Sequence, residues 1–190
     1  IGYEQSEFAR EAKIVQVDID KTELEKTKSM VEISLNCDAR DFITKLVSYL
    51  EKQKIFIAQP HDWYETCNGY RNRYPFIGPE HEDKNGFINS YKFMDQISNY
   101  LKKDQIVVTD MGTGLLSGHQ ALRIKQGQRL MTSTGLGEMG YGLPGAIGAS
   151  VARNKGEVLC LNCDGGMMMN LQEIQTLVHH QLPIKLFIFN

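Results

Sequence analysis

The stretch that decides the fold runs from residue 157 to residue 166 and reads EVLCLNCDGG. Its apolar part, residues 158–163, predicts a buried strand over 157–162, and the polar and glycine residues at 164–166 predict a turn after it. The two glycines leave backbone N–H groups accessible to phosphate oxygens, and the aspartate beside them is a hard oxygen ligand suited to Mg²⁺. An isolated Asp-Gly-Gly is more often merely a turn. The surrounding sequence must decide between these readings.

The same alternation of strands and helices extends over most of the chain after Gly86. We predict strands at 105–109, 129–133, 157–162 and 184–190. The predicted helices lie at 90–101, after 110–112 through His119, at 143–151 and after Gly166. In the last of these helices, Asn170 and Glu173 are spaced like a capping box. Strands that alternate with helices indicate parallel strands joined by right-handed crossovers, so the fold class is α/β, a parallel sheet with helices on both faces.

The first half of the chain has a different organisation. A strand over 13–20, a polar segment and an amphipathic helix over 38–52 indicate the tail of a second, Rossmann-like α/β domain. Residues 53–85 are rich in aromatic and turn residues and are interpreted as a linker. We therefore expect three parts: 1–52, 53–85 and 86–190. Because both ends fall within an expected element, we expect a fragment of a longer chain, truncated at its C-terminus.

Composition excludes several classes of function. The 190 residues are 42% hydrophobic and carry a formal charge of -2, with no basic excess for a nucleic-acid partner. No apolar run is long enough for a membrane span and no leader resembles a signal peptide, so the cytoplasm is the expected location. Cys160 and Cys163 form Cys-x-x-Cys, but zinc needs a second pair, and residues three apart on a strand face opposite ways. We interpret both as ordinary buried cysteines.

Polar or backbone-exposing residues follow each predicted strand of the second half. They lie at 110–113, 134–139, 164–166 and at Asn190. In an open parallel sheet, ligands bind beyond the carboxyl ends of the strands. The sequence thus predicts a ligand site there.

A nicotinamide site is the rival interpretation. Gly135, Gly137 and Gly140 form G-x-G-x-x-G after a strand, and Asp164 ends the next strand. In that fingerprint the helix begins within the glycines, whereas Gly142 and the proline after it would disrupt its first turns here. A phosphate site is favoured, and the dehydrogenase remains an alternative.

Three stretches together resemble a known family. They read GLGEMGYGLPGAIG over 135–148, DGGMMMNLQE over 164–173 and LPIKLFIFN over 182–190. They are similar to the cofactor-binding domain of the thiamine-diphosphate enzymes, and acetolactate synthase is the most similar subgroup. The resemblance is strong from Gly86 onward, while 8–50 resembles the end of that family's central domain. It implies the thiamine-diphosphate-binding fold.

The resemblance also implies roles for particular residues. Asp164 corresponds to a magnesium ligand, in a motif whose final asparagine pair falls at 190 and 191, with its metal-binding member just beyond Asn190. Met139 corresponds to the residue that keeps the cofactor bent. The implied contacts to the diphosphate are Gly112, Thr113, Gly165 and Gly166, and those to the aminopyrimidine are Gly137 and Met139.

The implied activity is that of a thiamine-diphosphate- and Mg²⁺-dependent carboligase or decarboxylase. The cofactor supplies the chemistry by which a 2-oxo acid such as pyruvate loses carbon dioxide and the remainder joins a second carbonyl compound. The resemblance implies a homo-oligomer with active sites shared between subunits and a place in branched-chain amino acid biosynthesis. The resemblance places the activating glutamate in an N-terminal domain outside this chain. We therefore expect this chain to carry no catalytic residue and not to convert substrate by itself. Another thiamine-diphosphate lyase and a non-catalytic assembly module remain alternatives.

Flavin-dependent relatives place the adenine end of FAD at four positions of the central domain. In this sequence, the corresponding positions are Asp18, Ile19, Asp38 and Ala39. Many relatives keep this domain without flavin, and a polar strand end is the favoured interpretation of Asp18.

Three positions depart from the family pattern. Cys163 replaces a glycine of the metal motif, Glu138 replaces a threonine, and Thr113-Gly114 replaces a Gln-His pair. These departures are compatible with cofactor binding, but they make the implied reaction less specific.

Overall fold

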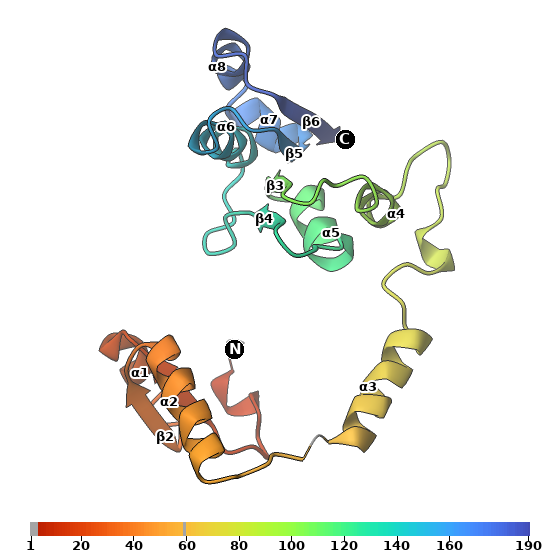
Figure 1. Ribbon diagram of the computed structural model, residues 1–190. Coiled ribbons are helices and arrows are strands. Elements are labelled where there is room, and N and C mark those ends of the chain that lie inside the picture. The colour runs from red at the N-terminus through yellow and green to blue at the C-terminus, as the bar shows by residue number, and fades with distance from the viewer. Residues whose placement is uncertain (1–3, 59) are drawn as a thin grey trace. The chain divides into compact units, whose positions relative to one another are not determined.

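The computed structural model describes residues 4–58 and 60–190 (Figure 1). The chain forms two compact units that divide between Tyr64 and Glu65, within helix α3 (His61–Arg73). Within the described residues, none of the helices combines the length and apolar character that crossing a membrane requires.

The first unit contains a two-stranded parallel sheet and its helices. Strand β1 (Val15–Asp18) pairs with β2 (Ile33–Asn36), and the helices are α1 (Lys21–Lys26) and α2 (Ala39–Lys52), after a 3₁₀ turn η1 (Gln5–Glu7). The predicted strand at 13–20 and helix at 38–52 are confirmed. Strand β2 and helix α1 lie in the segment interpreted only as polar, where the strand is four residues long and Leu24 is the helix's single buried residue.

The second unit carries the alternating elements expected after Gly86. Helix α4 (Ser90–Ile97), strand β3 (Ile106–Thr109), helix α5 (Thr113–Ala121) and strand β4 (Arg129–Met131) come first. Helix α6 (Gly142–Ala152), strand β5 (Val158–Cys163), helices α7 (Asp164–Met169) and α8 (Glu173–His179) and strand β6 (Ile184–Phe189) complete it. The segment predicted as a linker contains α3 and a 3₁₀ turn η2 (Pro79–His81).

The sheet of this unit has the order β4-β3-β5-β6, with every pair parallel. Alternate residues of its central strands enter two different cores, because successive side chains of a strand point to opposite faces. Val107 packs with Met94 of α4 and Ala121 of α5, whereas Val108 packs with Ala146 of α6. Helices therefore cover both faces of a parallel sheet, as predicted.

The chain after β5 differs from the prediction. Instead of one helix with a capping box at Asn170 and Glu173, it forms α7 directly from Asp164, breaks at Asn170, and resumes as α8. The N-cap of α8 is Gln172, and its side chain makes no cap hydrogen bond. The Asn170 side-chain amide instead donates to the carbonyl oxygen of Gly140, 2.7 Å away. The capping-box prediction is wrong because a tertiary contact uses this side chain.

Candidate functional site

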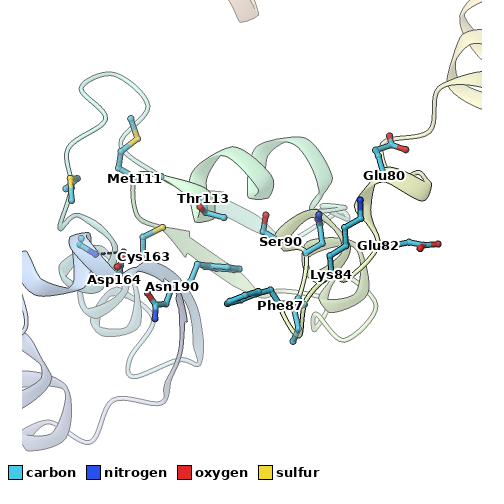
Figure 2. A pocket seen from close by; sticks show the side chains of 17 residues that line it. Glu80, Glu82, Lys84, Phe87, Ser90, Met111, Thr113, Cys163, Asp164 and Asn190 are labelled. Atoms are coloured by element: carbon cyan, nitrogen blue, oxygen red, sulfur yellow. Dashed lines mark hydrogen bonds between the residues drawn. The ribbon is translucent and has the colours of Figure 1, made fainter.

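The sheet has a topological switch point between β3 and β5. After β3 the chain returns as β4 on one side, and after β5 it returns as β6 on the other. Such a point leaves a crevice beyond the strand ends, which is the usual ligand position in open α/β sheets. A cavity of about 640 Å³ opens there, between the loops that follow β3 and β5 (Figure 2).

Residues from both loops and from a third segment line this cavity. Figure 2 shows Asp164, Cys163 and Asn190 at one end, and Lys84, Ser90 and Glu82 at the other. The predicted site residues that line it are Gly112, Thr113, Met139, Asp164, Gly165 and Gly166. The structure thus brings together six of the seven positions singled out for this unit. The segment 80–90 was not predicted to take part, since its acidic and turn residues carry no motif.

Gly137 is the seventh position and lies beside the cavity wall. Its backbone N–H donates to the carbonyl oxygen of Ser133, 2.8 Å away, and a Cβ at Gly137 would meet the Met111 methyl at 2.8 Å. In the same loop the Ser133 hydroxyl donates to the Glu138 carboxylate, and this hydrogen bond lowers the pKa of Glu138. Hydrogen bonds within the loop therefore stabilise its conformation, and the Glu138 carboxylate accepts one of them.

Asp110, which the sequence analysis placed among the strand-end residues 110–113 without assigning it a role, has the most buried carboxylate of the site. It is fully buried, and its Oδ1 accepts hydrogen bonds from the N–H groups of Gly140 at 2.9 Å and Gly142 at 3.3 Å. Its Oδ2 has no hydrogen-bond partner among the described residues. A charged residue at the end of an otherwise apolar strand marks a position of interest in the sequence, but its burial and hydrogen-bond partners appear only in the fold.

Two positions of the site require glycine because neighbouring side chains approach the backbone closely there. A Cβ on Gly166 would lie 1.4 Å from Oδ2 of Asp110, so no larger residue fits there. Gly112 has φ = +99°, a conformation that favours glycine, and a Cβ on it would lie 3.2 Å from Sγ of Cys163. Both positions therefore favour glycine strongly over any larger residue.

Asp164 is exposed and begins α7 at the cavity wall. Its Oδ1 accepts the N–H of Gly165 at 2.7 Å, so most of the carboxylate's acceptor capacity remains available to a ligand. Asn190 lines the same cavity and offers a second oxygen. Within residues 4–58 and 60–190, no three His, Cys, Asp or Glu side chains cluster closely enough to hold a metal ion.

The two cysteines of Cys-x-x-Cys are free and face opposite ways. Cys160 lies in the core beneath α6, while Cys163 lines the cavity, where its sulfur accepts the N–H of Gly114 at 3.4 Å. Burial, with the nearby Asp110 carboxylate, raises the pKa of Cys160 to about 12. Their interpretation as ordinary buried thiols rather than a zinc or redox pair is supported by this arrangement.

Cys160 is therefore expected to resist alkylation in the folded protein. At neutral pH a thiol with a pKa of about 12 holds roughly a thousandth of the thiolate of an unperturbed cysteine, and thiolate is the reacting form. Iodoacetamide followed by peptide mass spectrometry should modify the exposed Cys67 first, and Cys160 only after denaturant is added. Modification of both at equal rates without denaturant would contradict this assignment.

The predicted flavin positions lie at the ends of adjacent strands in the first unit. Asp18 ends β1, and Asp38 caps α2 just after β2, with its Oδ1 accepting the N–H of Arg40 at 2.7 Å. Oδ1 of Asp18 accepts the N–H of Asp20 at 2.8 Å. Ile19 and Ala39 follow these aspartates directly. Both carboxylates have local structural roles, which supports the polar-strand-end interpretation, and flavin binding stays a prediction.

The geometry of the glycine-rich loop disfavours a nicotinamide site. Helix α6 begins at Gly142, after the last glycine of Gly135–Gly140, rather than within the glycines. Asp164 directly follows β5, which β3 separates from β4. In the dinucleotide fingerprint the acidic residue instead ends the strand adjacent to the glycine-bearing one.

Comparison with known proteins finds the family that the sequence resembles. The family described as "Thiamine pyrophosphate enzyme, C-terminal TPP binding domain" matches residues 110–190, thiamine pyrophosphate being another name for thiamine diphosphate. Acetolactate synthase large subunit of Porphyra purpurea is 34% identical over 185 residues, which cover 97% of this chain and 30% of that protein. Acetolactate synthase isozyme 1 large subunit of Escherichia coli K12 is 32% identical over 185 residues, covering 97% of this chain and 31% of that protein.

The similarity extends beyond the matched domain. It includes the first unit, since nearly the whole chain aligns, although the chain spans only about 30% of the length of these relatives. Residues 110–190 are thus similar to the C-terminal TPP-binding domain of the thiamine pyrophosphate enzymes, and the chain as a whole is related to the acetolactate synthase large subunits.

Proposed function

We propose that the cavity between β3 and β5 binds the diphosphate end of thiamine diphosphate together with Mg²⁺. The observation that carries the proposal is the convergence of 112–113, Met139 and 164–166 on one cavity at the switch point of the sheet. These segments lie far apart in the sequence and meet only because their strands are parallel. The match of residues 110–190 to a TPP-binding domain supports the same ligand.

The residues present suit such a group. Gly112, Gly165 and Gly166 line the cavity with no side chain of their own to occlude it, which suits the approach of phosphate oxygens to the backbone. The Asp164 carboxylate and the Asn190 side chain are oxygen donors of the kind Mg²⁺ prefers, and Mg²⁺ commonly completes its shell with phosphate and water. A metal bound with few protein ligands is thus consistent with the lack of a three-residue cluster among the described residues.

Met139 has the position of a support for the ring portion of the cofactor. It is half exposed at the cavity, and a Cβ on Gly165 would lie 2.9 Å from its methyl carbon. A flexible apolar side chain there can pack under a bound ring without demanding one shape. The bound cofactor would supply the carbanion chemistry for a 2-oxo acid. In the whole protein, we propose an acetolactate synthase-like carboligation within a homo-oligomer.

The direct test is calorimetric titration of the chain with thiamine diphosphate in the presence of Mg²⁺. We expect saturable binding that EDTA abolishes, because the diphosphate depends on the metal for charge neutralisation. NADH serves as the matched control for the dehydrogenase alternative and should show no saturable heat. Saturable NADH binding with no response to thiamine diphosphate would overturn the proposal.

A further inference from the structure

We propose that Asp110 is a positioning residue, which holds the turn at Gly140, and with it Met139, in place over the cavity. The proposal rests on the function proposed above, because Met139 matters here as a cofactor support. Asp110 is absent from the cavity lining, so it would act through other residues and not by touching a ligand.

The backbone of Asp110 is itself anchored in the sheet. Its backbone N–H donates to the carbonyl oxygen of Leu161 in β5 at 3.0 Å, which ties the end of β3 to the neighbouring strand. The residue is also fully buried. A side chain anchored in this way can define the place of whatever it binds.

The turn it binds is fixed from both sides. The N–H of Gly140 donates to Oδ1 of Asp110, and the carbonyl oxygen of Gly140 accepts the Asn170 amide. Gly140 has φ = +91°, and a Cβ on it would meet Met169 and Asn170 at 2.8 Å. Since Met139 directly precedes this residue, these contacts also restrain the backbone of Met139.

The second carboxylate oxygen contacts the opposite wall. Oδ2 lies against Gly166, where a Cβ would be only 1.4 Å away. The neighbouring Gly165 faces the Met139 methyl. One buried carboxylate thus sets the distance between the turn that carries Met139 and the first residues of α7. A charged acceptor makes shorter and stronger hydrogen bonds than a neutral one, so asparagine would hold the turn less firmly.

The test uses the Met139 methyl signal in protein labelled with ¹³C-methyl methionine and free of cofactor, assigned by its absence in Met139→Leu. Asp110→Ala should shift and broaden that signal, and Asp110→Asn should do so to a smaller extent. The same variants should weaken thiamine diphosphate binding in Mg²⁺ by about tenfold and about threefold. Neither effect requires turnover.

Ser150→Ala is the matched control. Ser150 of α6 is equally buried and donates to the carbonyl oxygen of Gly156 at 2.9 Å, but it does not line the cavity. Its loss should lower the melting temperature while leaving the Met139 signal and the cofactor affinity unchanged. An equal shift of the Met139 signal in Ser150→Ala would reduce Asp110 to a general structural role and overturn the proposal.

An unmoved Met139 signal in Asp110→Ala would also overturn it. If that variant does not fold, Asp110→Asn decides: a moved Met139 signal supports positioning and an unmoved one refutes it. If the wild-type chain binds no thiamine diphosphate, the proposed function fails for this chain, yet the methyl comparison in cofactor-free protein still decides the role of Asp110.

Discussion

Gly166→Ala is expected to destabilise the second unit severely and to abolish thiamine diphosphate binding. The new Cβ would lie 1.4 Å from Oδ2 of Asp110, a side chain that is fully buried and bound to the turn at Gly140. Overpacking of this kind typically costs about 1–3 kcal/mol, and more where neither partner can move. We expect the free energy of unfolding from urea titration to fall by at least about 2 kcal/mol.

Gly148→Ala is the matched control for that variant. Gly148 lies in α6, and a Cβ on it would have nothing within 4 Å. Alanine in a helix costs less conformational entropy than glycine, so this variant should gain about 0.5–1 kcal/mol. Asp110→Ala in the Gly166→Ala background should recover part of the lost stability, because the clash is removed. Stability of Gly166→Ala within about 0.5 kcal/mol of wild type would contradict the close approach.

The architecture of the second unit was predictable because its strands are short apolar runs bounded by polar and glycine residues. The run at 158–163 became β5 and is buried at every position, as the central strand of a parallel sheet must be. The parallel order then placed 110–113 and 164–166 at one edge. The match to a known family confirms the fold, while the ligand roles of these residues stay predictions.

What the sequence could not reveal depends on contacts between distant residues. The role of Asn170 follows from its distance to Gly140, and no local pattern distinguishes that use from a helix cap. Asp110 was visible as a polar strand end, but its hydrogen bonds to the glycine-rich loop exist only in the folded sheet. Strand β2 was missed because four residues pair mainly through the backbone, which leaves little side-chain signal.

Asp164→Ala is expected to weaken thiamine diphosphate binding in Mg²⁺ by at least about tenfold while leaving the fold intact. The side chain is exposed, so the free energy of unfolding should change by less than about 0.5 kcal/mol. This separates it from Gly166→Ala, where binding and stability should fall together. Asp164→Asn keeps an oxygen ligand but loses the charge, and we expect an intermediate affinity.

The control for the metal assignment is Glu82→Ala, which removes another carboxylate lining the same cavity. Figure 2 shows Glu82 at the opposite end from Asp164, so electrostatic loss alone would affect both variants, whereas metal ligation would affect only one. Titration of thiamine diphosphate at several Mg²⁺ concentrations distinguishes these cases, because loss of a ligand raises the Mg²⁺ concentration needed for half-maximal binding. An unchanged Mg²⁺ requirement in Asp164→Ala would remove Asp164 from the metal site, and an equal increase in Glu82→Ala would show that general negative charge attracts the ion.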